Sequence, residues 1–528
     1  MTNHWIDFKN ADVILVMGAN QASNHPVSMK WVARAKARGA KLIVVDPREI
    51  PLTRFAAKWL RPKPGTDIAW INGFLHVILK EGLLDEAYVK ARTVGLDDVK
   101  KVVEKYTPEY VEKISGIPAA DLVEAARLYA GVKAASILYT MGITQHICGT
   151  DNVKSLANLA MICGNVGIQG GGVNPLRGQN NVQGACDMGG LPNVYSGYQA
   201  VNNAAVKEKM EKAWGVTGLS EKPGLTATQM IPAAHEGKLK ALYIVGENPL
   251  VSDPDVTHAE ASLRHLDFLV VEDIFLTETA KLAHVVLPAA CFAETSGTFS
   301  NTERKVQRVR KAVDPPGLAK SDWEIVADIS SRMGYPMSYP DADAIMAEIA
   351  RVTPSYCGIS FKRLEKDGIH WPCTGTDHPG TPCLHVDKFA CGLGVFSAVE
   401  WTPPAEPVDA EYPLTLTTGR VLYQYHTGTM TMKSPGLNDR APECFVEMAA
   451  DDARALGVSD GQMVRVSSRR GGIEVRAKVS AMTPKGTVFI PFHWASAAAN
   501  RLTSATALDP VCRIPEYKVC AVRIGAAV

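Results

Sequence analysis

The sequence predicts an α/β protein built from two related α/β domains and a small C-terminal β-barrel domain. Apolar strands alternate with helices near the N-terminus, the same order of elements returns after residue 240, and short strands separated by turn residues follow residue 408. Apolar strands that alternate with helices are typical of parallel sheets covered on both faces. A chain of 528 residues is too long for one hydrophobic core and suggests several domains.

The first α/β domain opens with a βαβ unit. Residues 12–17 (DVILVM) form an apolar strand that Gly18 ends, residues 26–38 form an amphipathic helix, and residues 42–45 form the next strand. Helical stretches then dominate until a further buried strand at residues 135–140. Because these strands carry apolar residues on both faces, we expect a parallel sheet between two layers of helices.

The second α/β domain repeats this order. Residues 241–245 (ALYIV) form a strand, residues 246–249 (GENP) form a turn before a helix, and residues 268–271 form a strand that ends at Glu272 and Asp273. Both domains therefore run strand, Gly-x-Asn, helix, strand and acidic residue. We interpret them as two related nucleotide-binding halves, with ligands beyond the carboxyl ends of the strands. The GxGxxG fingerprint is absent, which disfavours a plain NAD site.

A connector and a β-barrel complete the chain. Residues 336–407 are rich in Pro, Gly, Cys and His with little periodicity, so we expect an irregular connector. The barrel strands are expected at residues 414–417, 464–467, 473–479 and 488–490. Arg470-Gly471-Gly472 separates two of them as a hairpin turn. The predicted domains are residues 1–179, 180–335, 336–407 and 408–528.

Composition excludes several classes of function. Hydrophobic residues make up 46% of the chain, charged residues make up 21%, and the net charge is +1, so nothing favours binding to nucleic acid or to an anionic membrane. No apolar run approaches the ~20 residues of a transmembrane helix, and residues 1–12 do not resemble a signal peptide. We expect a cytoplasmic protein, although an export signal on a further N-terminal polypeptide stays open.

The eleven cysteines are scattered along the chain. No two are separated by only two or three residues, so neither a zinc ribbon nor an iron–sulfur motif is written here. Cys373, Cys383 and Cys391 lie among three histidines, but their irregular spacing argues against a metal site. The pattern is typical of reduced, mostly buried thiols.

The glycine-rich segment 170–190 (GGGVNPLRGQNNVQGACDMGG) is the most informative part of the sequence. It places Arg177 among seven glycines, three asparagines and two glutamines. Glycine costs about 1 kcal/mol in a helix interior, so a core helix is excluded. The segment suits a large polar ligand held by backbone N–H groups and amides, with one guanidinium for an anion. A mobile surface loop is the alternative, although flexible linkers are rich in Ser and Gly instead.

Residues 173–189 (VNPLRGQNNVQGACDMG) closely resemble the active-site segment of molybdenum- or tungsten-dependent formate dehydrogenases, in the dimethyl sulfoxide reductase family. The resemblance runs from Met1 to about Arg523. It implies a dimethyl sulfoxide reductase-like fold and two pyranopterin guanine dinucleotides that hold one metal ion. It also implies interconversion of formate and CO2, with electrons passed to an iron–sulfur relay. Arg177 is then the catalytic candidate that binds formate, with Gln179 and Asn180 beside the cofactor.

Candidate residues for the first dinucleotide follow the strands. Gly18 and Asn20 lie after the first strand, where helix N–H groups attract phosphate, and an ordinary tight turn is the alternative. Asp46 and Arg48 lie after the second strand, where an acid commonly accepts from ribose hydroxyls and simple solvation is the alternative. The resemblance implies that Asp67 contacts a guanine of the cofactor, and the alternative is that it caps a helix.

Three further groups of candidates are assigned by the resemblance. The pterin group is Gly142, Thr144 and Gln145. The next residue, His146, is expected to face the metal as a second catalytic candidate, and the alternative is a structural role, which is more common for a lone histidine. The group for the second dinucleotide is Gly246, Glu247, Asn248, Asp273, Thr277, Thr279 and Asp322. The barrel group is Arg420, Gln424, His426, His493, Asn500, Tyr517 and Lys518. The family has His and Ser where Gln424 and His426 stand, while Glu516-Tyr517-Lys518 matches its closing motif.

Catalytic chains of the family begin with a four-cysteine iron–sulfur segment, a lysine, and then the cysteine or selenocysteine that ligates the metal. None of these is present, so no metal ligand is expected in the chain. We expect the ligand and the 4Fe-4S cluster upstream of Met1 or on a separate N-terminal chain, with electron-transfer subunits as further partners. The sequence thus predicts a chain that cannot turn over formate alone and that exposes an apolar face. A non-catalytic scaffold within a larger redox complex is the alternative, and a NAD-dependent dehydrogenase is a remoter one.

Overall fold

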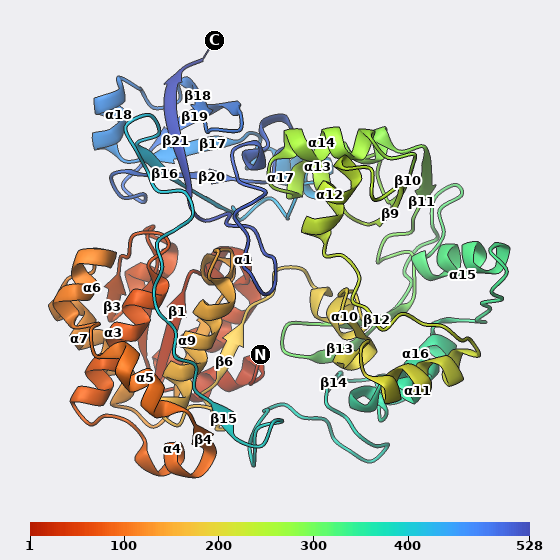
Figure 1. The fold of residues 1–528 in the computed structure, drawn as a ribbon, viewed down its shortest axis with the longest axis horizontal. Helices are drawn as coiled ribbons and strands as arrows, with labels where there is room; N and C mark the ends of the chain where they lie inside the picture. The colour runs from red at the N-terminus through yellow and green to blue at the C-terminus, as the bar shows by residue number, and fades with distance from the viewer. Residues whose placement is uncertain (528) are drawn as a thin grey trace. The chain divides into compact units, whose positions relative to one another are not determined.

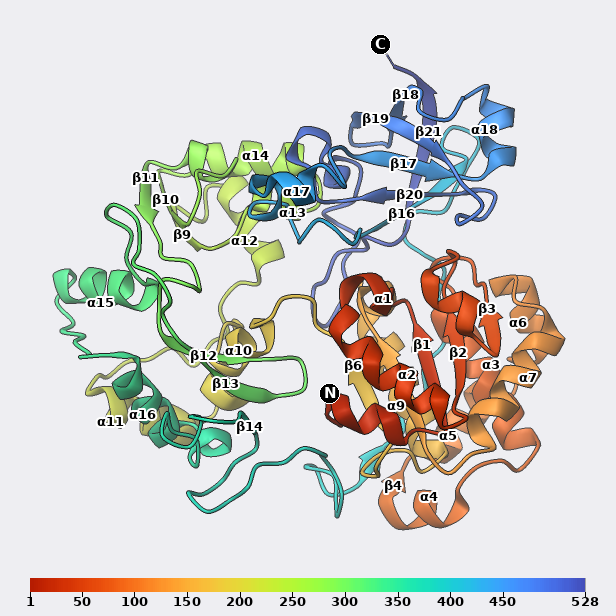
Figure 2. The same ribbon diagram turned by 180° about the vertical axis from the view of Figure 1, so that it is seen from behind.

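The structure is a computed structural model that describes residues 1–527. The chain divides into two compact units, which are described one at a time. Unit 1 comprises residues 1–176, residues 249–259 and the chain from residue 383 onward, and unit 2 comprises residues 177–248 and 260–382. Figure 1 and Figure 2 show the ribbon from opposite sides.

Unit 1 contains a five-stranded parallel sheet with the order β3-β2-β1-β5-β6. Its strands are β1 (Val13–Met17), β2 (Lys41–Val45), β3 (Lys58–Leu60), β5 (Ala135–Tyr139) and β6 (Val173–Pro175). β1 runs parallel to β2 on one side and to β5 on the other, with Leu15 in register with Ile43 and Ile137. The carboxyl ends of the three central strands therefore meet at one edge.

Helices cover both faces of this sheet because β1 alternates its apolar side chains between two cores. Val13, Leu15 and Met17 pack in one core with residues of the helices that cover the first face, whereas Ile14 and Val16 pack in a second core. The first face is covered by α3 (Asp67–Lys80), α7 (Ala119–Ala130) and α9 (Gly149–Ile162), and the second by α2 (Met29–Ala37). Figure 1 shows α9 in front of the sheet, and Figure 2 shows α2 on the opposite face. The predicted two-sided burial is confirmed.

Shorter elements complete this part of unit 1. They are α1 (Gln21–Asn24), α4 (Glu86–Arg92), α5 (Leu96–Val103), α6 (Pro108–Ser115), α8 (Met141–Thr144), α13 (Pro249–Ser252), α14 (Val256–Arg264, within which the division into units falls), and the parallel pair of β4 (Thr93–Val94) and β15 (Gly394–Val395).

The C-terminal domain is a closed six-stranded barrel with the order β16-β20-β17-β19-β18-β21. The strands are β16 (Leu414–Gly419), β17 (Phe445–Met448), β18 (Met463–Ser467), β19 (Gly472–Val479), β20 (Thr487–Pro491) and β21 (Cys520–Ala526), with α17 (Pro435–Asn438) and α18 (Ala450–Leu456) between them. Val464, Val475 and Val488 are among the buried residues of its core. The predicted hairpin is present, since β18 and β19 pair antiparallel and Ser468 N donates to Gly471 O at 2.9 Å.

Unit 2 holds a three-stranded parallel sheet with the order β11-β10-β9 and an antiparallel sheet with the order β12-β13-β14. The parallel strands are β9 (Ala241–Val245), β10 (Phe268–Asp273) and β11 (Val285–Pro288), and the antiparallel strands are β12 (Gly297–Ser300), β13 (Lys305–Val309) and β14 (Ile369–His370). The helices are α10 (Val182–Asp187), α11 (Ala204–Trp214), α12 (Ala227–His235), α15 (Asp322–Arg332) and α16 (Ala342–Val352), and β7 (Val194–Tyr195) pairs with β8 (Gln199–Ala200).

The stretch 336–407 holds more regular structure than its composition suggested. α16 begins after Asp341, whose carboxylate accepts from Ala344 N at 3.0 Å as an N-cap. It buries Met346 against a core that includes Tyr356 and Phe361. The domain boundaries drawn from the sequence remain predictions. Over the residues described, no helix is both long and apolar enough to cross a membrane.

Candidate cofactor site

The loops after β1 and β5 touch each other through two glycines. Gly18 has a φ of +51°, and a Cβ atom added to it would lie 2.7 Å from the carbonyl carbon of Gly142. Gly142 N donates to Gly18 O at 3.1 Å, and the Thr140 hydroxyl donates to the same oxygen at 2.6 Å. Only glycine fits such an approach, so two residues predicted separately for the site share one position at the sheet edge.

Asn20, which follows Gly18, carries a buried side-chain oxygen without a hydrogen-bond partner among the residues described. An unpaired buried amide oxygen costs free energy comparable to a lost hydrogen bond. Its presence at the carboxyl end of β1 therefore fits a polar ligand that donates to it.

Asp46 and Arg48 follow β2, and they differ in whether another side chain neutralises their charge. Burial raises the pKa of Asp46 to about 6, although its bond from Arg48 N at 2.9 Å and the Arg48 charge oppose this rise. The Arg48 guanidinium donates to Glu447 of β17 at 2.8 Å and lies 3.5 Å from the Phe489 ring centroid. The charge of Arg48 is thus paired with a carboxylate of the barrel, whereas Asp46 remains a buried acid at the strand end.

Lys518 brings a buried cation to the same region of unit 1. Its Nζ donates to Thr418 O at 2.6 Å. Burial lowers the pKa of Lys518 to about 7, and the nearby Arg420 and Arg48 charges lower it further while Asp46 opposes them. Burial also lowers the pKa of Arg420. Because Arg48 is paired with Glu447, Lys518 and Arg420 are the two cations of this interior that an anion would stabilise.

The remaining barrel candidates bind protein groups. Gln424 donates to Ala441 O at 2.8 Å and accepts from the Thr431 hydroxyl at 2.6 Å. Asn500 donates to Val251 O and Ser252 O at 2.9 Å, and the Tyr517 hydroxyl donates to Ser252 O at 3.0 Å. Asn500 and Tyr517 thus fasten the barrel domain to α13, while Gln424 joins two segments of the barrel domain itself.

His493 and His426 are neutral in this region. His493 Nε2 accepts from Val421 N at 3.0 Å, and its Nδ1 lies against His426 O. Burial, supported by the charge of Arg420, lowers the pKa of both histidines to about 4. They therefore add no charge to the cations nearby.

His146 lies at the end of the loop that carries the pterin candidates. Thr144 donates to the Met141 sulfur at 3.4 Å, and Gln145 is half-buried. His146 itself is 2% exposed and lies 3.7 Å from Asp67 Oδ2 and 3.6 Å from Glu516 Oε1. The structure thus brings together Asp67 and His146, which the sequence placed in separate parts of the site.

The glycine-rich segment divides into two parts with different roles. In unit 1, Gly170 N donates to the buried Asp7 at 2.9 Å, and a Cβ atom on Gly170 would lie 2.6 Å from the carbonyl carbon of Asn10. These first glycines therefore pack against the N-terminal turn and do not cradle a ligand, contrary to our expectation for the whole segment. The reason is that close packing and ligand binding both require glycine.

Arg177 opens unit 2 and is held at two points. Its backbone N–H donates to the Thr302 hydroxyl at 2.9 Å, and its guanidinium donates to the Cys186 sulfur at 3.3 Å. Gln179 is half-buried and Asn180 is exposed. The next residue, Asn181, accepts from Ser300 N at 2.9 Å. The main chain on both sides of Gln179 and Asn180 is therefore tied to the turn between β12 and β13.

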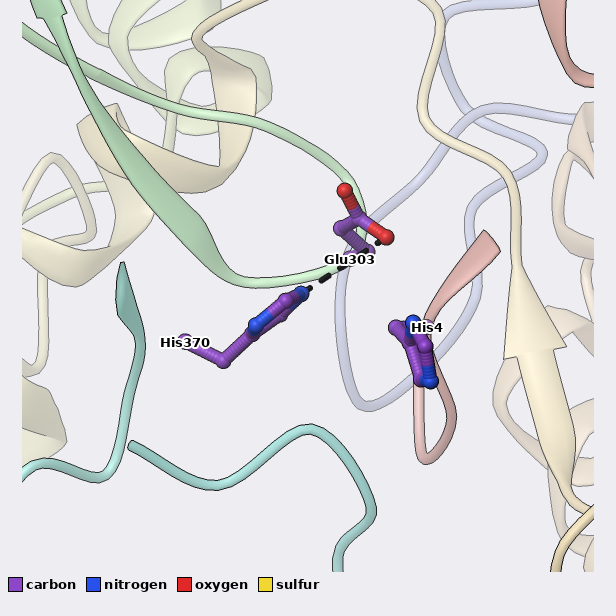
Figure 3. Close-up of side chains that lie close together, drawn as sticks. All are labelled: His4, Glu303 and His370. Atoms are coloured by element: carbon purple, nitrogen blue, oxygen red, sulfur yellow. Dashed lines mark ion pairs between the residues drawn. The ribbon is translucent and has the colours of Figure 1, made fainter. Parts of the chain in front are cut away.

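That turn is itself fixed by charged side chains. Glu303 lies 3.6 Å from His370 Nε2, as Figure 3 shows. Arg304 is 2% exposed and donates to Thr381 O at 2.9 Å and Pro382 O at 3.1 Å, and also to Trp371 O. The support of Arg177 thus rests on a buried network rather than on a mobile loop.

The candidates for the second dinucleotide gather at the carboxyl ends of β9 and β10, as predicted. Asn248 accepts from Thr279 N at 3.2 Å and from the Thr279 hydroxyl at 2.7 Å. Asp273 accepts from Phe275 N at 3.2 Å, and Thr277 accepts from Ala280 N at 3.1 Å. These bonds hold the strand-end turns, while burial raises the pKa of Glu247 beside Gly246.

Asp322 begins α15 next to a second carboxyl group. Ser321, not Asp322, is the N-cap, and it forms a capping box with Glu324. Burial raises the pKa of Asp322, and burial together with Asp322 raises the pKa of Glu272 to about 7, although the Tyr243 hydroxyl donates to Glu272. Asp322 therefore does not serve as the N-cap of α15.

Sequence reasoning missed Glu516, Thr302 and Cys186 as members of the site. Glu516 stood in a motif that we quoted, and its position between two predicted cofactor residues was the available signal. Cys186 stood in the quoted segment 170–190, whereas Thr302 had no such signal, because its contact with Arg177 depends on tertiary structure.

A parallel α/β sheet joined to a closed barrel, with loops gathered around buried cations, defines a dinucleotide-binding protein. Two family descriptions match the chain: molybdopterin oxidoreductase over residues 1–332 and molydopterin dinucleotide binding domain over residues 414–521. The chain belongs to the molybdopterin oxidoreductases of the dimethyl sulfoxide reductase family, and its similar relatives include formate dehydrogenase alpha subunits.

Three comparisons give the extent of the likeness. F420-dependent formate dehydrogenase 1 subunit alpha of Methanococcus maripaludis is 50% identical over 99% of this chain and 78% of its own length. Formate dehydrogenase H of Escherichia coli is 41% identical over 99% of this chain and 74% of its own length. The solved structure of acetylene hydratase from Pelobacter acetylenicus has a TM-score of 0.77 at 22% identity, over 98% of this chain and 78% of that one. The last likeness concerns the fold.

Proposed function

We propose that this chain is the bis(pyranopterin guanine dinucleotide)-binding portion of a molybdenum- or tungsten-dependent formate dehydrogenase that interconverts formate and CO2. The observation that carries the proposal is the buried cationic group of Arg420 and Lys518 beside strand-end loops shaped by glycine. Relatives named as formate dehydrogenases support the substrate.

The residues present fit such a cofactor. In unit 1, Asn20 offers an unpartnered buried oxygen, and Lys518 offers a cation that burial has left half-neutral at about pH 7. A bound phosphate or pterin oxygen would restore the full charge of that amine. In unit 2, Glu247 and Asp322 offer exposed carboxyl groups for the hydrogen-bond donors of the second dinucleotide. Each unit thus supplies one set of strand-end groups.

Arg177 is the proposed formate-binding residue. When bound, the metal and its pterins supply the acceptor for two electrons, and the protein binds and orients the substrate. A guanidinium pairs bidentately with a carboxylate, each charged hydrogen bond contributing about 1.5–3 kcal/mol. The bond to Cys186 restricts the side-chain rotamers of Arg177, so less conformational entropy is lost on binding.

We further propose that turnover requires polypeptide beyond residues 1–528, which would supply the metal-ligating cysteine or selenocysteine and an iron–sulfur cluster. The chain spans 78% of the length of the methanococcal relative. The electron acceptor would belong to separate subunits, and a cytoplasmic location is proposed.

Purification of the chain from a host that makes the dinucleotide cofactor tests the proposal. Acid release should yield about two GMP per chain, with no formate oxidation by the chain alone. Arg177→Ala should keep the GMP content and, in the complete enzyme, lower kcat/KM for formate by at least about 100-fold. Lys101→Ala, on the exposed surface, is the control. A chain that binds no guanine nucleotide would refute the proposal. If the chain binds the nucleotide but Arg177→Ala leaves kcat/KM for formate unchanged in the complete enzyme, the scaffold alternative would be favoured.

A further inference from the structure

The His146 imidazole lies between two buried carboxylates from distant segments. Its Nε2 is 2.9 Å from Gly142 O and 3.7 Å from Asp67 Oδ2, and its Nδ1 is 3.6 Å from Glu516 Oε1. The side chains of His146 and Glu516 are each 2% exposed and that of Asp67 is 12% exposed. Water therefore has little access to the three charges.

Geometry favours a doubly protonated ring. The Nε2–H donates to Gly142 O, so a neutral imidazole would turn the Nδ1 lone pair toward the Glu516 carboxylate. Among the residues described, His146 is the only basic group within 4.0 Å of Asp67 or Glu516. An unpaired buried carboxylate is costly. The imidazolium thus offsets two acids at once.

The electrostatic surroundings agree with this assignment. Burial alone lowers the pKa of His146, but Glu516 and Asp67 outweigh it, and the pKa is raised overall. The Cys148 thiol also faces this cluster, and burial together with Asp67 and Glu516 raises its pKa to about 12. It therefore carries no charge at neutral pH and does not compete for the proton. Asp67 in turn helps to raise the pKa of the nearby Asp46.

The cluster joins two segments that we propose contact the cofactor. His146 directly follows Gln145 and bonds back to Gly142, so it closes the loop of pterin candidates. Glu516 directly precedes Tyr517 and Lys518, accepts from Ile147 N at 3.4 Å, and accepts from Ala405 N at 3.0 Å. Thr150, farther along the same loop, donates to Asp509 at 2.8 and 2.9 Å. The loop and the closing segment are therefore fastened at two points.

We infer that His146 is a positioning residue, whose imidazolium, held by Asp67 and Glu516, fixes the Gly142–Gln145 loop against the Tyr517–Lys518 segment. The inference rests on the proposed function only in taking these segments as cofactor contacts. It assigns His146 a role different from contact with the substrate or the metal, because Nε2 bonds to Gly142 O and Nδ1, which has no hydrogen-bond partner among the residues described, lies 3.6 Å from the Glu516 carboxylate.

The pH dependence follows from the direction of the pKa shift. Because the folded pKa of His146 is raised above that of the unfolded chain, the stabilisation is fully present below about pH 6.5. It is lost as the pH rises through the folded pKa. The contribution of the His146 charge to cofactor retention should therefore weaken on the alkaline side.

The test compares purified holo chains that differ in these three charges. His146→Gln keeps a donor for Gly142 O but removes the charge, and it should lower GMP retention by more than about tenfold. It should also reduce the alkaline pH dependence to the part that belongs to Lys518. The triple variant His146→Gln, Asp67→Asn, Glu516→Gln leaves no unpaired carboxylate and should recover much of the retention. His265→Gln, an exposed change of the same kind, is the control.

Two readouts separate the possible failures. Unchanged retention and an unchanged pH profile in His146→Gln would overturn the inference, as would a triple variant no better than the single one. If the wild-type chain binds no GMP, the proposed function fails, yet thermal unfolding against pH still tests the ion cluster. In that case only a more positive alkaline slope of stability against pH in His146→Gln supports it, because the loss from His146 is removed while the opposite contribution of Lys518 remains, and an unchanged profile refutes it.

Discussion

Buried asparagines of this protein differ in whether their side-chain atoms have hydrogen-bond partners. Asn500 is saturated by two main-chain carbonyl groups and Asn248 by Thr279 and Glu278, whereas Asn20 keeps a buried oxygen without a partner. Since buried polar atoms are nearly always paired, Asn20 has a stronger physical claim to a ligand than the other two amides. The sequence does not separate the three, because each follows a strand or lies in a loop.

Lys518 predicts how the free energy of unfolding of the cofactor-free chain changes with pH. Its folded pKa of about 7 lies below the ordinary value of 10.5, so between these values the unfolded chain binds more protons and the free energy of unfolding rises with pH. Between about pH 7 and pH 9 this contribution is about 2 kcal/mol. Lys518→Met should remove it, as urea unfolding of both proteins at the two pH values will measure. Equal slopes in the two proteins would contradict the assignment.

Gly18 provides a test of the contact between two loops. Gly18→Ala places a Cβ atom 2.7 Å from the Gly142 backbone at a φ of +51°, whereas Gly39 has a φ of +98° with nothing within 4 Å of the added atom. We expect Gly39→Ala to cost about 1 kcal/mol from backbone strain alone, and Gly18→Ala to cost about 3 kcal/mol because the loops must also separate. Denaturant midpoints measure both. Equal losses would show that the approach to Gly142 is not restrictive.

At the scale of elements, β17 is joined to the loop after β2 by one ion pair. Glu447 has a side chain 1% exposed, paired with Arg48 at 2.8 Å and bonded to the Thr483 hydroxyl at 2.5 Å. Burial raises the pKa of Glu447, but Arg48 and Thr483 outweigh this effect, and the net direction is downward. The pair therefore fixes the barrel to the first sheet.

Arg48→Met should destabilise unit 1 by about 3–5 kcal/mol, since it leaves Glu447 buried without its main partner. Adding Glu447→Gln should recover part of the loss. Because the folded pKa of Glu447 is lowered, the stabilisation is present above about pH 4.5 and is lost as the pH falls. Chemical unfolding at pH 7 and pH 4 measures both effects. A double variant no more stable than Arg48→Met would contradict them.

The sequence predicted strands that are apolar over their whole length and strands in which apolar and polar residues alternate regularly. β1, β5, β9 and the barrel strands β16, β18, β19 and β20 lie within about two residues of their predicted ranges. β17 was missed because Glu447 interrupts its apolar pattern, and only the tertiary pair with Arg48 makes that residue compatible with burial. The predicted helix at residues 26–38 is split, since a 3₁₀ turn at Pro26–Ser28 precedes α2. α16 was missed because irregular sequence surrounds it.

At the scale of the whole molecule, the two strand-end groups fall in different compact units. The candidates from Gly18 to Gln145 and those of the barrel belong to unit 1, while Arg177 and the candidates from Gly246 to Asp322 belong to unit 2. Pattern analysis predicted which loops carry the polar residues, because the carboxyl ends of parallel strands are defined by the order of elements. It did not predict which polar side chains bond to the protein itself and are therefore not available to a ligand. Arg48, Gln424 and Asn500 have partners that lie hundreds of residues away or in a neighbouring loop.

The parallel sheet of unit 2 exposes apolar side chains on one face, while the apolar face that we expected from the sequence stays a prediction. Tyr243, Val245 and Phe268 are 40%, 45% and 46% exposed, whereas Leu269 and Val271 on the opposite face are fully buried. The register pairs Tyr243 with Val270, so alternate residues of β9 and β10 share this face. Parallel sheets are normally covered on both faces, and an uncovered apolar face promotes association.

We therefore expect the isolated chain to self-associate and to bind an apolar dye through this face. The double variant Val245→Lys, Phe268→Lys should lower dye binding by about half and keep the chain monomeric at higher concentration, because two ammonium groups oppose burial of the face. Leu318→Lys is the matched control, since Leu318 is 87% exposed and lies outside the sheet. Light scattering and dye fluorescence measure the outcome. An equal effect of Leu318→Lys would mean that added charge, and not the β9–β10 face, governs association.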